Sequence, residues 1–391
     1  MELESTDRAL ASAYRVRQRS GNTVRKRLSK RDKAAIMAAP VTRLSTTNET
    51  IEYLSQPEAR RGTVLYLAYG SNLSNETFRG NRGIKPLSQV NVQIPSLRLT
   101  FDLPGLAYAE PCFANTGRRD PNNDPPRKDA QEGLDEKAPL LGGRSGGRRY
   151  RKDDWHKGLV GVVYEVTPGD YAHIIATEGG GSSYHDILVD CHPFESSDPT
   201  VPVPQNPTTP AFRAHTLFAP ATPSGENPPK DGGRFQRPNI SYAQASARYL
   251  KLLTDGADEC GLPNEYQEYL HALRPYTMTS NKQRLGQFIY LSLWMPFIVM
   301  VFAMSRMFAD EKGVQPDWLK QLTAAIFKAS WGSYDGFFKP LFGDGERSIP
   351  DGGDEAPEDD DIVQAKAKAK AKGSTHTDHL PDLEKAAHVA P

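Results

Sequence analysis

The sequence predicts one compact domain of mixed strands and helices, interrupted by polar insertions and followed by a hydrophobic helix. Apolar and aromatic runs of strand length recur between residues 62 and 218, and helical patterns follow them up to residue 285. Only 38% of the 391 residues are hydrophobic, and 31 Pro and 32 Gly interrupt the chain, so much of it is too polar to pack. The 21 residues between Arg284 and Arg306 carry no charge.

The two ends differ in composition from the centre. Residues 1–61 hold few large apolar residues and a cluster of Arg and Lys between Arg15 and Arg31, so we expect a disordered basic arm. Contact of this arm with anionic lipid is the alternative. Residues 343–391 carry an acidic run and then Lys-Ala repeats, which predicts a disordered tail. The compact domain should therefore lie within residues 62–285.

The first strand of this domain is predicted at residues 64–69 and leads into a tight turn. Every residue from Val64 to Tyr69 is apolar or aromatic, which is typical of a strand buried on both faces. Gly70, Ser71 and Asn72 break the strand, because Gly accepts positive φ and Ser and Asn bond to nearby backbone. Such a turn points N–H groups at a pocket that suits an anion or a carbonyl oxygen. An ordinary strand-to-helix connection is the alternative.

Further strands are predicted at residues 87–101, near Phe113, at residues 159–166, 184–191 and 212–218. Stretches rich in polar residues, Gly and Pro lie at about residues 115–157 and 196–237, and we expect disordered insertions there. Two helices should follow, one capped by Ser241 and one opened by Pro263.

One predicted helix ends in a carboxylate. Thr167 and Pro168 are typical of a helix start, and Tyr171 and Ile174 mark its apolar face. Glu178 falls on the same face at the C-terminal end. A carboxylate held in line with buried residues suits a general base. The alternative is an exposed last residue of a fraying helix.

Three segments in this order resemble the γ-glutamylcyclotransferase family. Tyr69-Gly70-Ser71-Asn72-Leu73 is similar to the family's signature loop. The strand that begins at Gly158-Leu159-Val160-Gly161 leads to Glu178-Gly179, like the strand and the catalytic Glu-Gly of the family. The stretch from Pro238 to Leu273 resembles its C-terminal helical hairpin.

This resemblance implies a fold, a reaction and a site. The fold would be α+β: a small mixed β-barrel with packed helices, followed here by the C-terminal hydrophobic helix. The reaction would cyclise an N-terminal γ-glutamyl group to 5-oxoproline and release an amine or amino acid, with Glu178 as general base. No cofactor or metal would be needed. The substrate-binding residues would be Tyr69, Gly70, Ser71, Asn72, Leu73 and Tyr184.

Two other function classes fit the same residues. One is a non-catalytic, membrane-tethered module that binds γ-glutamyl metabolites, although a pure binder has no need of a base such as Glu178. The other is an acyltransferase that passes the γ-glutamyl group to a second amine. Nucleic acid is not expected as a partner, because 48 Lys and Arg balance 48 Asp and Glu. The sequence indicates neither the second half of the substrate nor an oligomeric state.

The hydrophobic segment at residues 286–306 predicts membrane association. A helix needs about 20 apolar residues to cross a bilayer core, so we expect a span. The alternative is a helix that lies on the domain or in the membrane plane. Lys282 and Arg284 favour a cytoplasmic location for the catalytic domain. Residues 307–342 predict an amphipathic segment at the membrane surface. The insertions, the basic arm and the hydrophobic segment resemble fungal members of the family.

Overall fold

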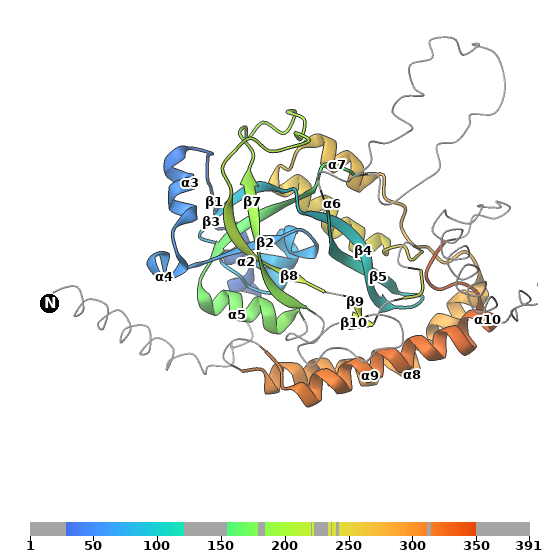
Figure 1. The fold of residues 1–391 in the computed structure, drawn as a ribbon. Coiled ribbons are helices and arrows are strands. Elements are labelled where there is room, and N and C mark those ends of the chain that lie inside the picture. Colours follow the sequence, from blue (N-terminus) through green and yellow to red (C-terminus); the bar gives the residue numbers. More distant parts are fainter. Residues whose placement is uncertain are drawn as a thin grey trace, which may run out of the picture. The chain divides into compact units, whose positions relative to one another are not determined.

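The structure is a computed structural model, shown in Figure 1. It describes residues 29–120, 155–178, 184–219, 221–222, 234–235, 237–239, 242–310 and 314–348. Most of the predicted insertion at about 115–157 and parts of the one at 196–237 lie outside these residues, as do residues 1–28 and 349–391.

The centre of the fold is a closed β-barrel of five strands. Its strands are β2 (Val64–Ala68), β3 (Ser88–Ile94), β6 (Leu159–Val166), β7 (His185–Pro193) and β8 (Phe212–Phe218). They pair in the order β3-β6-β2-β8-β7, and β7 pairs back to β3 through Val92 and Pro193. The pairing is antiparallel except between β2 and β8, so the barrel is mixed. The predicted α+β barrel is confirmed.

Two strands of the barrel are buried on both faces. All residues of β2 and of β6 are buried, as expected for strands that have the barrel interior on one face and helices on the other. The edge strand β1 (Thr42–Arg43) pairs in parallel with the start of β3.

A long hairpin extends the domain beside the barrel. It consists of β4 (Leu97–Leu106) and β5 (Glu110–Arg118), with an irregular register between Thr100 and Leu103. Tyr108 at its tip has a φ of 63°, which is uncommon for a residue with a side chain. The short strands β9 (Ala221–Thr222) and β10 (Arg234–Phe235) form a separate parallel pair.

Helices α5 (Pro168–Thr177), α6 (Ala247–Cys260) and α7 (Asn264–His271) pack around the barrel (Figure 1). The predicted start of α6 at Ser241 is wrong, because the Ser246 side chain accepts the cap hydrogen bond from the Tyr249 N–H. The chain before Ser246 is held in extended form, since Tyr276 donates its N–H to the Ala245 carbonyl. The helix ends at Cys260, with Gly261 as its C-cap at a φ of +59°.

Residues 29–61 differ from the predicted disordered arm. They contain α2 (Lys30–Ala38), α3 (Asn48–Ser55) and α4 (Glu58–Arg61). Ser29 and Thr47 cap the first two helices, and Leu54 is fully buried. Arg79 donates to the carbonyls of Ile36 and Ala39 and so fixes α2 to the domain. A few well-placed caps and apolar residues therefore outweigh the polar average composition of the segment.

Two long helices follow the domain. They are α8 (Asn281–Phe308), which contains the predicted hydrophobic segment, and α9 (Asp317–Ser333). The π-helical turn η5 (Tyr334–Phe338) and α10 (Lys339–Phe342) complete this region. A second small core joins it to the tip of the β4–β5 hairpin; its members are Ala107, Tyr108, Tyr290, Trp331, Tyr334 and Phe338.

The predicted tail begins later than expected. Residues 343–348 pack on the domain, with Asp344 and Glu346 buried. Arg237 binds Glu346 and Asp335 through both edges of its guanidinium, and it lies 4.2 Å from the centre of the Trp331 ring. These buried ion pairs hold the described end of the chain in place.

Candidate active site

The loop after β2 forms one wall of a pocket. Tyr69 follows the strand directly, Gly70 comes next, and Ser71–Leu73 form the single 3₁₀ turn η1. Gly70 has a φ of −114°, so positive φ is not the reason for a glycine here. A Cβ at this position would lie 3.3 Å from the Tyr249 Oη and 3.5 Å from the Ala114 Cβ. Glycine lets the loop approach α6 and β5 closely.

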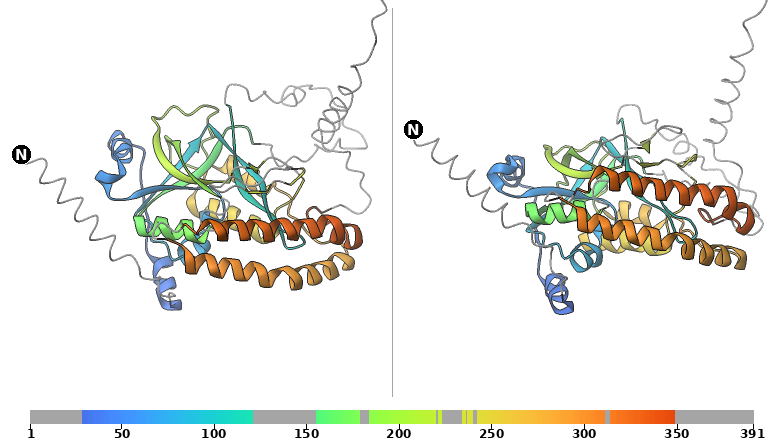
Figure 2. Two further views of the ribbon diagram at one scale, coloured as in Figure 1. Left: turned by 60° about the horizontal axis from the view of Figure 1, so that its bottom comes forward. Right: turned by 90° about the horizontal axis from the view of Figure 1, so that it is seen from below.

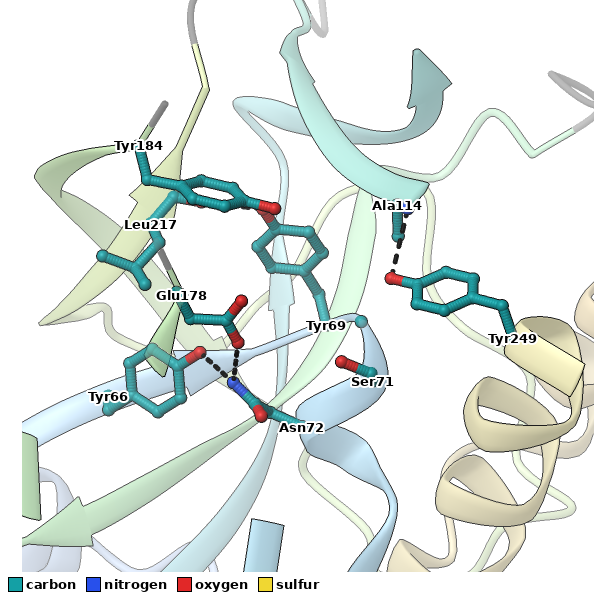
Figure 3. A pocket seen from close by; sticks show the side chains of 10 residues that line it. Tyr66, Tyr69, Ser71, Asn72, Ala114, Glu178, Tyr184, Leu217 and Tyr249 are labelled. Carbon is teal, nitrogen blue, oxygen red and sulfur yellow. Dashed lines mark hydrogen bonds between the residues drawn. The ribbon is translucent and has the colours of Figure 1, made fainter. Parts of the chain in front are cut away.

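The pocket brings together most of the predicted site residues (Figure 3). Of the predicted residues, Glu178, Tyr69, Gly70, Ser71, Asn72 and Tyr184 line it. The other lining residues are Tyr66, Ala114, Leu217 and Tyr249.

Leu73 is the predicted site residue that does not line this pocket. It is fully buried and packs beneath α6, where a Cβ on Gly256 would lie 2.6 Å from the Leu73 Cβ. Its place in the 3₁₀ turn aims its side chain into the hydrophobic core. Leu73 therefore fixes the loop from below, and the structure does not support its predicted contact with a substrate.

Glu178 stands at the end of α5 with its carboxylate in the pocket. It is the residue directly after the last helical one, and its side chain is 20% exposed. Its Oε1 accepts hydrogen bonds from Asn72 Nδ2 at 2.9 Å and from Arg82 Nη2 at 2.5 Å. Both of these hydrogen bonds are made to the same carboxylate oxygen, Oε1. Figure 3 shows the other carboxylate oxygen pointing toward the Tyr69 ring.

Asn72 connects the loop to the carboxylate. The same Nδ2 group also donates to the Tyr66 hydroxyl at 2.8 Å. Because this hydroxyl accepts from Asn72, its own proton remains available for another acceptor. These two bonds use both N–H groups of Nδ2, so this end of the Asn72 side chain positions Glu178 and Tyr66. The buried Oδ1 has no hydrogen-bond partner among the described residues, and Asn72 lines the pocket, so its contact with substrate stays a prediction.

Arg82 comes from the turn after the π-helical segment η2 (Glu76–Asn81). Its guanidinium also donates to Thr177, the last residue of α5, so it fixes the end of the helix as well as the carboxylate. The side chain is only 13% exposed. A charge-assisted contact of this kind is strong and directional.

Four tyrosines line the pocket around the Glu178 carboxylate. The Tyr69 hydroxyl donates to the Leu217 carbonyl at 2.7 Å, and the Tyr249 hydroxyl accepts from the Ala114 N–H at 3.2 Å. Burial raises the pKa of the phenols of Tyr66, Tyr69, Tyr184 and Tyr249, and the nearby Glu178 carboxylate raises each further. All four therefore stay protonated near neutral pH and can act as hydrogen-bond donors.

Tyr66, Arg82 and Tyr249 were not predicted as site residues from the sequence. Tyr66 and Tyr249 fit the apolar patterns of a strand and a helix, and such patterns do not separate a core tyrosine from one that lines a pocket. Arg82 lies in a polar stretch without a motif. No local signal in the chain marks its contact with Glu178, which is 96 residues away.

The arrangement suits proton transfer in an enclosed space. One carboxylate is fixed through one oxygen, hydroxyl groups surround it, and a loop of backbone amides lies opposite. A fixed base with donors placed around a reacting carbonyl is the usual requirement for acyl transfer without a metal.

Comparisons with known proteins show which proteins this chain resembles. The chain is 28% identical over 286 residues to the Aspergillus fumigatus protein named γ-glutamyl cyclotransferase gliK, covering 73% of this chain and 90% of that one. It is 27% identical over 301 residues to γ-glutamyl cyclotransferase aclK of Aspergillus oryzae, covering 73% and 91%. A family model described as the AclK C-terminal domain matches residues 280–341, which include α8 and α9.

A solved structure named γ-glutamyl cyclotransferase aligns with 57% of this chain and 96% of its own, with a TM-score of 0.34 and 18% identity. The sequence comparisons confirm the resemblance seen in the three motifs, and the two Aspergillus relatives agree with its fungal character. The chain is a homologue of the γ-glutamyl cyclotransferases.

Proposed function

We propose that this protein is a γ-glutamyl cyclotransferase that uses Glu178 as its general base. The observation that carries the proposal is the meeting of Glu178 and the Tyr69–Asn72 loop in one pocket, with the carboxylate fixed by Asn72 and Arg82. The names of the curated relatives support the same reaction.

The reaction is an intramolecular aminolysis. Glu178 takes a proton from the substrate's α-ammonium, and the free amine attacks the γ-carbonyl carbon to close a five-membered ring. The new C–N bond forms as the carbonyl electrons move to the oxygen. Collapse of this oxyanion breaks the bond to the leaving nitrogen. Over one turnover the attacking nitrogen loses two protons and the leaving nitrogen gains two, so Glu178 relays them and ends as the carboxylate.

The loop and the tyrosines supply the remaining requirements. We expect the amide N–H groups of the turn and the Ser71 hydroxyl to stabilise the oxyanion, because Gly70, Ser71 and Asn72 line the pocket. Tyr184 provides a donor for the polar ends of the substrate. The Tyr69 hydroxyl already donates to the Leu217 carbonyl, so Tyr69 contributes its ring to the pocket lining. A γ-glutamyl chain held in a curled form in this pocket would have its amine close to its own carbonyl.

The test is release of 5-oxoproline by the full chain. The substrates are γ-glutamyl amino acids, γ-glutamyl amines, glutathione and glutathione S-conjugates. Glu178→Gln should remain folded and lose activity by about 100-fold or more, because the amide is not a base. Glu52→Gln removes an exposed carboxylate of α3 and is the matched control. Near-normal turnover by Glu178→Gln would overturn the assignment of the base.

Other outcomes of this test identify the alternatives. No 5-oxoproline from any substrate, with the protein shown to be folded, would favour the binding module. Transfer of the γ-glutamyl group to an added acceptor amine, in place of cyclisation, would favour the acyltransferase.

We propose in addition that the chain associates with a membrane through α8. Within the described residues, α8 is the one helix that is long and apolar enough to cross a bilayer, and little of it is buried. The cytoplasmic location of the catalytic domain stays a prediction from Lys282 and Arg284.

A further inference from the structure

Helix α8 has one face that packs on protein and a much wider apolar face that does not. The packed side chains recur at spacings of three and four residues, as expected for one helical stripe. They are Gln283, Gln287, Tyr290, Trp294, Ile298, Val301 and Ser305. The remaining circumference carries large exposed apolar side chains. These are Leu285, Phe288, Ile289, Leu293, Met295, Phe297, Val299, Met300, Phe302, Met307 and Phe308.

The packed stripe is fixed at both ends and in the middle. Gln283 donates to the Asp344 carbonyl at 2.7 Å, and Gln287 donates to the Tyr108 carbonyl at 2.7 Å. Farther along α8, Trp294 Nε1 donates to the Ser333 hydroxyl at 3.0 Å, and Ser305 donates to Gln315.

Aromatic packing strengthens this attachment. The Tyr290 ring is fully buried between Tyr108 at 6.1 Å and Phe338 at 5.1 Å. Two of the partly exposed rings also contact α9: Phe302 contacts Phe327, and Phe308 contacts Trp318. Figure 2 shows α8 and α9 lying side by side along their length. Helix α8 is therefore bound to α9 and to the hairpin tip from its first turn to its last.

This attachment conflicts with a helix that crosses a bilayer. A helix of 28 residues is roughly 40 Å long, enough to cross, but a lone spanning helix is surrounded by lipid. Crossing would separate Gln287, Trp294 and Ser305 from their partners and leave those polar groups unpaired in hydrocarbon. It would also expose the second core around Tyr108 and Tyr290.

We propose that α8 lies in the plane of a membrane, in one leaflet, with its packed stripe toward the domain and its wide apolar face in the lipid. This inference deepens the proposed membrane association and does not depend on the proposed chemistry. It replaces the span predicted from composition. Phe288, which is 71% exposed, and Val299, which is 59% exposed, are the side chains that should enter the acyl region.

A lipid surface fits this face better than a second copy of the chain. Protein partners cover one stripe of a helix and leave a polar rim around it. On α8 the exposed side chains from Leu285 to Phe308 are apolar over most of the circumference. Lys282 and Arg284 are exposed in the first turn, where they can meet anionic headgroups.

The first test is binding of the full chain to vesicles. Phosphatidylcholine vesicles with about one fifth phosphatidylserine are sedimented with the protein, and the bound fraction is measured. The double variant Phe288→Glu/Val299→Glu should bind about tenfold more weakly or worse, because two carboxylates would have to enter the acyl region. Val201→Glu is the matched control, since Val201 is 47% exposed and lies far from α8 in sequence. Circular dichroism and 5-oxoproline release show that the double variant is folded.

The second test distinguishes an α8 that lies in the membrane plane from an α8 that crosses the bilayer. The full chain is synthesised with microsomes, with one epitope tag at each end, and the intact vesicles are treated with protease. An in-plane helix leaves both tags on one side, so both are digested. Protection of one tag only would show a span and overturn the in-plane proposal while leaving the membrane association intact.

Two further outcomes bear on the proposal. No vesicle binding by the wild-type chain would overturn the membrane association itself, whatever the result for 5-oxoproline. A stable dimer in lipid-free sedimentation that Phe288→Glu/Val299→Glu converts to a monomer would show that a second copy covers this face. A monomer that binds vesicles supports the lipid surface.

Discussion

The Glu178 carboxylate is held through one oxygen, and this has a direct chemical consequence. Asn72 and Arg82 both bind Oε1, so the carboxylate cannot rotate freely in the pocket. The second oxygen is then presented to the substrate in a fixed direction. A base in a fixed position lowers the entropy cost of proton transfer. Arg82 is thus a positioning residue that acts through Glu178.

Arg82→Gln should lower the kcat for 5-oxoproline release by roughly 10- to 100-fold, because the carboxylate loses its strongest anchor. Arg82→Lys restores the charge with one donor and should recover part of the rate. The control is Arg60→Gln, because Arg60 is exposed on α4. A normal kcat of Arg82→Gln would contradict the positioning role.

The site shows what a sequence can and cannot predict about single residues. Glu178 and the Gly70–Asn72 turn were predictable, because they stand at the ends of a helix and a strand and match a family pattern. The orientation of Asn72 was not predictable, since an amide in a turn can face either the substrate or the base. Leu73 was assigned to the substrate because it belongs to the same motif, but the 3₁₀ turn rotates it into the core.

Helix α6 depends on a glycine in its middle. Gly256 lies where the helix crosses the loop after β2, and a Cβ there would be 2.5 Å from the Leu73 carbonyl carbon and the Ser74 nitrogen. Both atoms belong to backbone, so neither can rotate away. The glycine therefore allows the loop and the helix to touch.

Gly256→Ala should destabilise the protein by roughly 1–3 kcal/mol, although alanine normally favours a helix. The matched control is Gly332→Ala in α9, where the added Cβ meets nothing within 4 Å. This change should leave stability unchanged or raise it by up to about 1 kcal/mol. Thermal and urea unfolding measure both variants. Equal effects of the two substitutions would show that the close approach at Gly256 is not a constraint.

Elements with strong patterns were predictable, and those fixed by distant contacts were not. The spans of β6 and β8 match residues 159–166 and 212–218, because each is a continuous apolar or alternating run. The start of α6 was wrong because Ser241 and Ser246 are equally good caps, and the Ala245–Tyr276 backbone bond selects the second. Helix α2 depends on Arg79, which is about 40 residues farther along the chain.

His215 is a titratable side chain that links the N-terminal helix α4 to the barrel strands β7 and β8. His215 of β8 donates its Nδ1–H to the Asp186 carboxylate of β7 at 2.7 Å, and its Nε2 lies 3.0 Å from the Glu58 carboxylate of α4. Burial lowers the pKa of this imidazole, but the hydrogen bonds and charges of Asp186 and Glu58 outweigh that effect, so the pKa is raised above its ordinary value. The Tyr171 ring packs against it.

A raised pKa in the folded state means that protonated His215 stabilises the whole fold. This contribution is complete below the unfolded pKa of about 6.5 and is lost as the pH rises through the folded value. The carboxylates of Glu58 and Asp186 are partly exposed, so the contribution of His215 to the free energy of unfolding should be below about 1 kcal/mol. The melting temperature of the wild type should therefore fall above pH 6.5 more than that of His215→Gln. His271→Gln, which removes an exposed pair at 3.8 Å, is the control and should follow the wild type. Parallel wild-type and His215→Gln curves would exclude His215 as a link between the helices and the barrel.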